Sequence, residues 1–298
     1  MIIDAIPPSG RLPHLGALRF TGPDSLSFLQ GQVSNDTRPL AEKQSLLAAY
    51  SSPQGRVLAL MHLLPHSSGV VAILPRELMK PTMEALRRFV LRAKVKIEEA
   101  EDLAVAGLHG TQHESAGNGY AETHGIGVAA VNRAPDRSWV IGAAGKLVEQ
   151  GLAGDVQPDQ IEQAWRLSDI RAGLPQIYLA TREIFVAQML NLDRLGGISF
   201  SKGCYTGQEI IARTQHLGRI KRRLYRLQLP AGEWLIGQPL RLVDGRSGRL
   251  VEVVRSTGGF EALAVLNVQA SADSADGGES VAGTAVAAEP LPLPYELR

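Results

Sequence analysis

Short apolar runs, each of strand length and each bounded by turn residues, recur through the first hundred positions of the sequence. They occupy residues 17–20, 45–50, 57–64 and 70–74. Runs of roughly four to eight apolar residues between turn residues are typical of buried β-strands. The N-terminal part of the chain is therefore predicted to form a β-sheet.

Two segments between these runs have the spacing of amphipathic helices. One begins at Pro23 and Asp24, and the other covers residues 76–92, where apolar side chains recur at intervals of three and four. Strands interleaved with helices predict an α+β layer, in which the first helix packs against one face of the sheet.

Further strands are predicted at residues 103–108, 125–131 and 137–142, with an exposed loop over 110–119. A helix is expected to begin at Pro158 and to end before Gly173, with Trp165 on its apolar side. From Leu224 onward, short strands separated by glycine and proline predict a small β-barrel. Residues 270–288 are mostly small and polar, and we expect a mobile loop there.

The composition excludes several classes of protein. The 298 residues carry a net charge of +1, so no overall field draws the protein to nucleic acid or to an anionic membrane. A single cysteine permits no internal disulfide, which favours a reducing compartment, the cytoplasm. The N-terminus has no signal-peptide pattern, and no apolar run reaches the ~20 residues of a membrane span. We expect a soluble, monomeric protein.

Residues 191–223 contain the only cysteine, several glycines and a dense run of cations. Gly203 and Gly207 flank residues 204–206, which predicts a tight turn that presents the Cys204 thiol. A helix is predicted from Ile210, and its dipole, together with Lys202 and Arg213, would stabilise the thiolate.

Three simpler observations limit this interpretation of Cys204. A lone cysteine in a cytosolic protein is most often a small buried apolar residue. His216 is the only histidine of the segment that could serve as its base. One cysteine and scattered histidines predict no metal site in this chain alone.

Residues 202–209, KGCYTGQE, resemble the defining motif of the YgfZ family of folate-binding proteins, which are relatives of the glycine-cleavage T-protein, an aminomethyltransferase. The resemblance extends to residues 28–37 (FLQGQVSNDT), 52–59 (SPQGRVLA), 171–175 (RAGLP) and 188–200 (QMLNLDRLGGISF). It fades in the C-terminal part.

The resemblance implies an α+β fold arranged as a three-domain cloverleaf of the aminomethyltransferase folate-binding type around a central hole. Residues 16–100 would form a folate-binding-type domain, and residues 1–15 plus 101–222 a second α+β domain that carries the KGCYTGQE motif. Residues 223–298 would form the C-terminal β-barrel. Tetrahydrofolate or a derivative would be the ligand.

The resemblance also assigns site residues. Cys204 would be the reactive thiol, and Trp165 would contact the folate and offer a stacking surface. Arg171, Gln188 and Asn191 would complete the folate site. The motif residues would be Lys202, Gly203, Cys204, Tyr205, Thr206, Gly207, Gln208 and Glu209.

Three departures from the family pattern bear on the folate site and its chemistry. Residues 14–16 stand where some members carry a second folate-contacting tryptophan, and Arg171 stands where the T-protein has a glutamate that grips the pterin ring. Residues 54–64 contain no acid, although the T-protein has its catalytic aspartate in this strand. Aminomethyl transfer is therefore not expected.

The function implied is that of an accessory factor for iron–sulfur enzymes, including those that methylthiolate tRNA. One alternative is a folate-dependent one-carbon or redox enzyme that uses Cys204. Another is a tRNA-binding adaptor, in which the basic patch of Arg219, Lys221, Arg222 and Arg223, with nearby Arg226, would hold phosphates or a folate polyglutamate tail. The same cations would also suit a solvated strand edge, so direct tRNA contact is expected to be weak.

Overall fold

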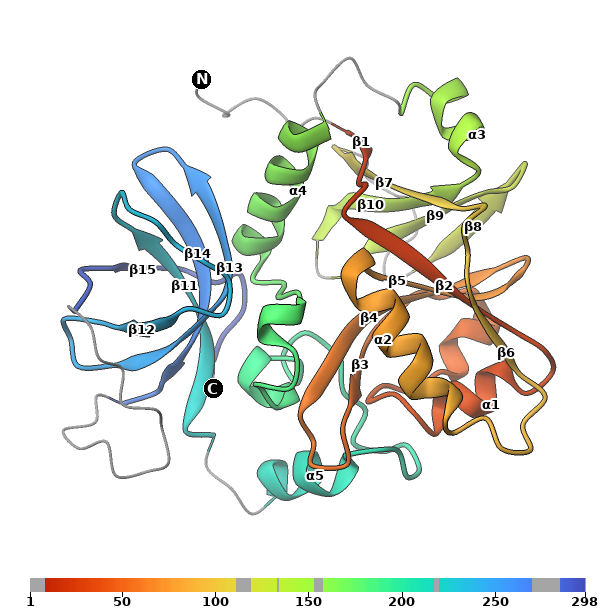
Figure 1. Ribbon diagram of the computed structural model, residues 1–298, viewed down its shortest axis with the longest axis horizontal. Coiled ribbons are helices and arrows are strands. Elements are labelled where there is room, and N and C mark those ends of the chain that lie inside the picture. The colour runs from red at the N-terminus through yellow and green to blue at the C-terminus, as the bar shows by residue number, and fades with distance from the viewer. Residues whose placement is uncertain are drawn as a thin grey trace.

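Three five-stranded β-sheets, with helices between and around them, make up the protein (Figure 1). The structure is a computed structural model, and it describes residues 9–110, 119–132, 134–152, 158–216, 220–269 and 285–297.

The first sheet contains all four apolar runs predicted in the N-terminal part. Its strand order is β3-β4-β5-β2-β6, and neighbouring strands are antiparallel. The strands are β2 (Leu15–Thr21), β3 (Leu46–Ser51), β4 (Val57–His66), β5 (Gly69–Pro75) and β6 (Lys96–Glu99). Almost every residue of β3, β4 and β5 is buried, which explains why these runs are continuously apolar.

Two α-helices and one 3-10 helix belong to this part of the chain: α1 (Ser25–Gln30), α2 (Arg76–Arg87) and η1 (Arg38–Glu42). The helix predicted over residues 76–92 ends early, at Arg87. Tight turns replace it, with the Phe89 amide donating to the Leu86 carbonyl. Val33 lies beyond α1 and forms a bridge with Tyr50.

The second sheet has the order β1-β7-β10-β9-β8 and includes the second group of predicted strands. These are β1 (Gly10–Arg11), β7 (Ala104–His109), β8 (Tyr120–Thr123), β9 (Ile126–Val131) and β10 (Ala134–Gly142). Helix α3 (Ala144–Glu149) follows β10. Helix α4 (Pro158–Ala172) has the predicted limits, and Gly173 ends it with a φ of +66°. Most of the predicted loop over 110–119 lies outside the described residues.

The third sheet has the order β12-β13-β14-β11-β15. Its strands are β11 (Arg222–Leu229), β12 (Pro239–Arg241), β13 (Ser247–Ser256), β14 (Gly259–Asn267) and β15 (Glu289–Leu291). The two outer strands approach each other at an isolated bridge between Leu242 and Val286. The C-terminal strands thus form a five-stranded sheet. The closure of this sheet into a barrel stays a prediction. Residues 270–284 of the predicted mobile loop lie outside the described residues.

The chain between α4 and β11 connects all three sheets. It contains η2 (Leu179–Thr181), η3 (Ala187–Leu190) and α5 (Gln208–His216). Val186 bridges to Arg56 beside the first sheet, and the Asn191 side chain donates to the Leu224 carbonyl in β11. Each sheet takes its strands from one of the three predicted residue ranges, but this segment contacts neighbours outside its own range. The division into domains stays a prediction.

One continuous hydrophobic core joins the first and second sheets and extends to the inner face of the third, from Phe20 and Met61 through Trp139 and Trp165 to Val251. Among the described residues, none of the helices has the length and apolar character that a bilayer crossing needs.

Candidate functional site

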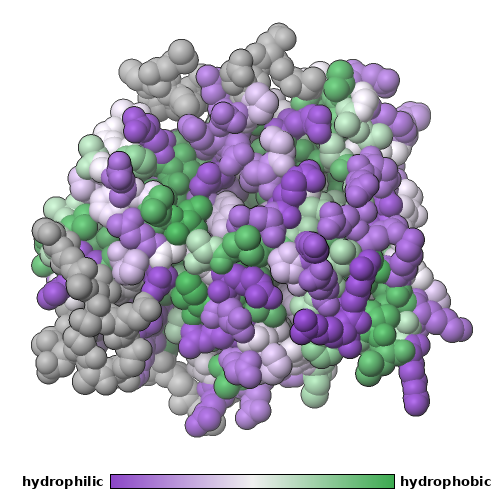
Figure 2. All heavy atoms as spheres, in the orientation of Figure 1, coloured by the Kyte–Doolittle hydropathy of each residue, from purple (hydrophilic) through white to green (hydrophobic). Residues whose placement is uncertain are grey.

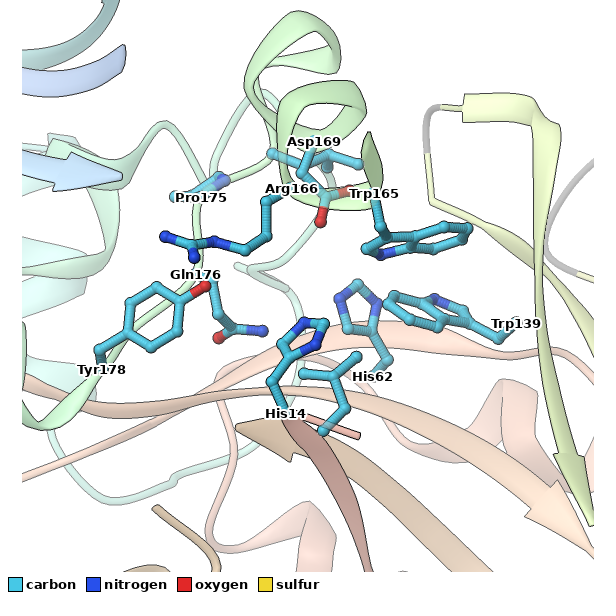
Figure 3. A pocket seen from close by; sticks show the side chains of 11 residues that line it. His14, His62, Trp139, Trp165, Arg166, Asp169, Pro175, Gln176 and Tyr178 are labelled. Atoms are coloured by element: carbon cyan, nitrogen blue, oxygen red, sulfur yellow. The ribbon is translucent and has the colours of Figure 1, made fainter. Parts of the chain in front are cut away.

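A narrow pocket lies where the first two sheets meet helix α4 (Figure 3). Five segments of the chain contribute to its wall: the start of β2, strand β4, strand β10, helix α4, and the chain that follows α4. The lining residues are His14, Leu15, His62, Trp139, Trp165, Arg166, Asp169, Leu174, Pro175, Gln176 and Tyr178. Figure 3 shows the two tryptophans side by side on one side of the pocket, with Arg166 and Tyr178 on the other.

Trp165 is held rigidly in this wall. Its ring lies 4.8 Å from the Trp139 ring and 5.1 Å from the His109 ring, and the Arg137 guanidinium lies 4.9 Å from its centroid. A Cβ on Gly107 would lie 2.2 Å from Trp165 Cζ3, so a larger residue at position 107 would displace the indole. Because Trp165 is only 1% exposed, it offers no free ring face, and the predicted stacking surface is not present.

Several buried N–H groups of the wall have no hydrogen-bond acceptor in the described structure. They are Nε1 of Trp139, Nε1 of Trp165 and Nε of Arg166. Leaving a buried donor unpaired costs about 1–3 kcal/mol, so such groups usually face a ligand or an ordered water. The pocket is thus suited to a molecule with hydrogen-bond acceptors.

Asp169 is the one acidic side chain among the lining residues, and it adds an acceptor to this set of donors. Its Oδ1 atom accepts a hydrogen bond of 2.7 Å from Arg137. Burial raises the pKa of Asp169, and the Arg137 charge opposes that shift. The pocket therefore combines unpaired donors with one carboxylate.

Arg166 and Tyr178 connect the pocket to the third sheet. Both bind the buried carboxylate of Glu252 on β13, with Arg166 Nη2 at 2.6 Å from one oxygen and the Tyr178 hydroxyl at 2.6 Å from the other. This side of the wall is therefore fixed from outside the pocket.

His62 brings a neutral imidazole to the pocket. Burial lowers its pKa to about 4, and the Arg137 charge acts in the same direction. Its ring lies 4.8 Å from the Trp139 ring. His62 was not predicted as a site residue; a polar residue in an otherwise apolar strand was the available signal. Residues 54–64 contain no acidic side chain. Strand β4, which covers most of this range, contributes a histidine to the pocket instead.

His14 lines the pocket at the position where some family members were expected to carry a second tryptophan. Its Nδ1 atom lies 3.3 Å from the Glu162 carboxylate on α4. Trp139, Arg166, Asp169 and Tyr178 were not predicted as pocket residues, because they come together only when the sheets and α4 pack.

Arg171, Gln188 and Asn191, predicted to bind folate, do not belong to this wall. The Arg171 guanidinium lies 2.8 Å from the Glu261 carboxylate on β14. Gln188 and Asn191 are fully buried, and they donate to the backbone carbonyls of Ile211 and Leu224. All three side chains therefore connect one part of the fold to another. The helical neighbour of Arg171 that faces the pocket is Asp169.

The KGCYTGQE motif is bound to the first sheet's side of the molecule through Lys202. The Lys202 ammonium donates to the carbonyls of Gln30, Val33 and Asn35 at 2.6, 2.8 and 2.8 Å. Burial lowers the pKa of Lys202 to about 8. Its three hydrogen bonds thus attach the motif to backbone oxygens of residues 30–35, and the predicted effect of its charge on the Cys204 thiolate stays a prediction.

Gly207 makes the second attachment of the motif. It has a φ of +83°, and a Cβ there would lie 2.6 Å from the Ser52 carbonyl oxygen. Opposite it, Gly55 has a φ of +72° and packs against Ile210. Gly203 behaves differently, because a Cβ there would meet no atom within 4 Å. The predicted requirement for glycine therefore applies to Gly207 and not to Gly203.

Cys204 is exposed, so it is not the small buried apolar residue considered as an alternative. Helix α5 begins at Gln208, two positions earlier than predicted. The Tyr205 amide donates to the Gln208 side chain at 3.3 Å, and the Thr206 amide donates to the Gly31 carbonyl at 3.3 Å. Together with the contacts of Lys202, these bonds hold the turn on both sides of the thiol. The side chain of His216 lies outside the described residues.

The predicted basic patch is largely used inside the protein. Arg223 is buried and pairs with Asp193 at 2.6 Å, and Arg226 pairs with Glu261 at 2.6 Å. The Arg222 side chain donates to Asn267, while Arg219 lies outside the described residues. Strand β11 lies between β14 and β15, so it is not a sheet edge either. Arg223 and Arg226 therefore belong neither to a phosphate-binding run nor to a solvated edge.

The fold is similar to that of a solved aminomethyltransferase structure. The glycine cleavage system aminomethyltransferase T from Bartonella henselae superposes with a TM-score of 0.66 over 87% of this chain and 78% of that protein, at 13% identity. The chain thus has the aminomethyltransferase type of fold. No family model matches the sequence.

Sequence relatives give a more specific result. The chain is 32% identical to the tRNA-modifying protein YgfZ of Hamiltonella defensa, over 80% of this chain and 74% of that protein. It is 31% identical to the protein of the same name from Yersinia pestis, over 91% of this chain and 88% of the relative. The chain belongs to the YgfZ family.

Proposed function

We propose that the protein binds a tetrahydrofolate derivative in the pocket beside Trp165 and supports the assembly or repair of iron–sulfur enzymes, including enzymes that methylthiolate tRNA. Membership of the YgfZ family and the name of its relatives, tRNA-modifying protein, support the connection to tRNA modification. The aminomethyltransferase type of fold is the basis for expecting a folate.

The observation that carries the proposal is the mixture of polar groups in the pocket. A pterin ring carries both acceptors and N–H donors along its edge. The unpaired N–H groups of Trp139, Trp165 and Arg166 suit the acceptors, and the Asp169 carboxylate suits the donors. His62 adds a neutral imidazole, which can donate through one ring nitrogen and accept through the other. The hydrogen-bonding groups present are therefore complementary to the edge of a pterin, and the narrow pocket would have to widen to admit the ring.

Aminomethyl transfer is not part of the proposal. The reaction needs a carboxylate placed for proton transfer, and β4 provides a histidine where an acid was expected. Asp169 comes from α4 and is already hydrogen-bonded to Arg137. When bound, the folate would supply one-carbon chemistry; the protein groups described here bind and orient it.

The position of Cys204 favours an accessory factor over an enzyme that uses this thiol on the bound folate. Cys204 is exposed on a turn attached to α1 and to the β3–β4 turn, and it is not among the residues that line the pocket. A thiol in such a place is accessible to a partner molecule from solution. The tRNA-binding adaptor has less support, because Arg223 and Arg226 have intramolecular acidic partners.

The test is rescue of tRNA methylthiolation in cells that lack the protein. Wild type is expected to restore methylthiolated tRNA, and Cys204→Ser is expected to fail at the same protein level and with the same affinity for tetrahydrofolate. Ser201→Ala, an exposed change in the same segment, serves as the control and should rescue. Full rescue by Cys204→Ser would refute the role of the thiol.

A further inference from the structure

We infer that an acidic partner protein docks on the chain between α2 and β6, on a surface made by Arg88, Phe89, Leu91, Arg92 and Lys94. We call it the α2–β6 surface. The inference rests on the proposed function and extends it, because it identifies where a client enzyme would bind.

Two apolar side chains protrude from this surface. Leu91 is 86% exposed and Phe89 is 42% exposed. Scattered exposed apolar residues are ordinary, but two that are neighbours in one short turn are less so. The Phe89 amide donates to Leu86 at 3.0 Å, and the Leu91 amide donates to Phe89 at 3.0 Å. The backbone thus turns in a way that holds both side chains outward.

The rest of the loop is clamped to its neighbours. The Arg87 guanidinium donates to the Ile97 carbonyl at 2.6 Å, and the Lys94 amide donates to the Asp24 carboxylate at 2.7 Å. Gly22 has a φ of +106°, and a Cβ there would lie 2.1 Å from the Lys94 carbonyl oxygen. A surface that is already rigid loses little conformational freedom on binding, which favours recognition.

The charges of the surface indicate the partner's chemistry. Arg88, Arg92 and Lys94 are exposed, and none of the three makes an ion pair with another described residue. Lys96, just beyond the surface, differs because it pairs with Glu98. In Figure 2 an apolar patch borders strongly polar side chains at the lower right, where Figure 1 places α1 and the chain after α2. Charge complementarity therefore calls for an acidic partner.

A protein satisfies the apolar part of this surface better than RNA does. Leu91 is aliphatic and gains nothing from base stacking, whereas a pocket on a protein would desolvate it. Two apolar side chains are also too few to anchor the protein to a membrane, since even a single long acyl chain binds only marginally.

The α2–β6 surface and Cys204 are attached to opposite ends of the same helix. Lys94 is bound to Asp24 at the start of α1, and Lys202 is bound to Gln30 at its end. Helix α1 has six residues, which corresponds to a length of about 9 Å. A partner protein seated on the α2–β6 surface would therefore reach the Cys204 turn.

The experiment introduces a photo-crosslinking amino acid at Leu91 or, as a control, at Leu235, which is 71% exposed beside the third sheet. Crosslinking is carried out in cells whose tRNA methylthiolation depends on the protein. We expect the Leu91 probe to capture an iron–sulfur tRNA-modifying enzyme, at least fivefold more than the Leu235 probe does. Adding Arg88→Glu and Arg92→Glu should abolish that product. Capture of RNA or lipid alone, or equal yields from both positions, would overturn the inference.

Rescue assays separate this inference from the proposed function. Leu91→Asp should reduce methylthiolated tRNA at least fivefold while tetrahydrofolate affinity stays at the wild-type value, and Leu235→Asp should rescue fully. Full rescue by Leu91→Asp together with failure of Cys204→Ser would reject only the α2–β6 surface. Full rescue by Cys204→Ser would instead reject the proposed function.

Discussion

Gly107 and Trp165 fit together so closely that a methyl group on the glycine would lie 2.2 Å from the indole ring. The glycine is on β7 and the tryptophan on α4, so this contact sets how closely the helix approaches the second sheet. The pocket wall depends on that approach.

Gly107→Ala should therefore displace Trp165 and weaken tetrahydrofolate binding, by about tenfold or more, with a loss of stability of about 1–3 kcal/mol from overpacking. Titration calorimetry and denaturant unfolding measure the two effects. Gly145→Ala is the matched control, because a Cβ at that exposed position meets no atom within 4 Å. Wild-type folate affinity in Gly107→Ala would show that the pocket does not depend on this contact.

Gly207→Ala should detach the motif from the β3–β4 turn. The substitution combines a φ of +83° with a contact of 2.6 Å to the Ser52 carbonyl oxygen. Such backbone strain costs about 1–3 kcal/mol, and denaturant unfolding should register it. Gly203→Ala provides the comparison, since its Cβ would meet no atom within 4 Å. Equal stability of the two variants would contradict the described turn.

His62 should make the stability depend on pH. Its pKa is about 4 in the folded protein and about 6.5 when unfolded. The unfolded chain therefore binds more protons between these values, so stability is complete above pH 6.5 and falls as the pH drops toward 4. The full shift corresponds to about 3 kcal/mol. His62→Gln should remove this part of the pH dependence, whereas exposed His124→Asn should leave it. An unchanged profile in His62→Gln would contradict the assignment.

Arg223→Gln should destabilise the protein by about 3 kcal/mol, because it removes the close ion pair of the largely buried Asp193 carboxylate and leaves only Arg194, at 3.5 Å. Arg222→Gln, one residue earlier, loses only a bond to Asn267 and should cost less than about 1 kcal/mol. Thermal unfolding of both variants distinguishes this structural role from phosphate binding. Similar, small losses in both would favour an exposed cationic patch.

Much of the secondary structure could be predicted from local pattern. The strands were found because their apolar runs are bounded by turn residues, and α4 because Pro158 and Gly173 mark its ends. The end of α2 was missed for a physical reason. The spacing of apolar residues continues through Val90, but the chain has already left the helix at Arg87. Periodicity cannot distinguish a side chain that faces the core from one that protrudes, as Leu91 does.

The pocket was less predictable, because its residues meet only in three dimensions. Trp165 was expected there from the family resemblance, whereas His62 and Asp169 are single polar residues in an apolar strand and in a mixed helix. The cations of β11 looked free because their partners, Asp193 and Glu261, are distant in the sequence. The position of Lys202 among three carbonyls has no sequence signal at all.

The pocket beside Trp165 is proposed to bind a reduced folate. Calorimetric titration of tetrahydrofolate into wild type, Asp169→Asn and Arg171→Gln tests it most directly. Arg171 lies on the same helix, and Glu261 keeps Arg226 when Arg171 is removed, which makes it a matched control. We predict that wild type and Arg171→Gln bind equally and that Asp169→Asn binds about tenfold more weakly or worse. No binding by wild type, or unchanged binding by Asp169→Asn, would contradict the claim.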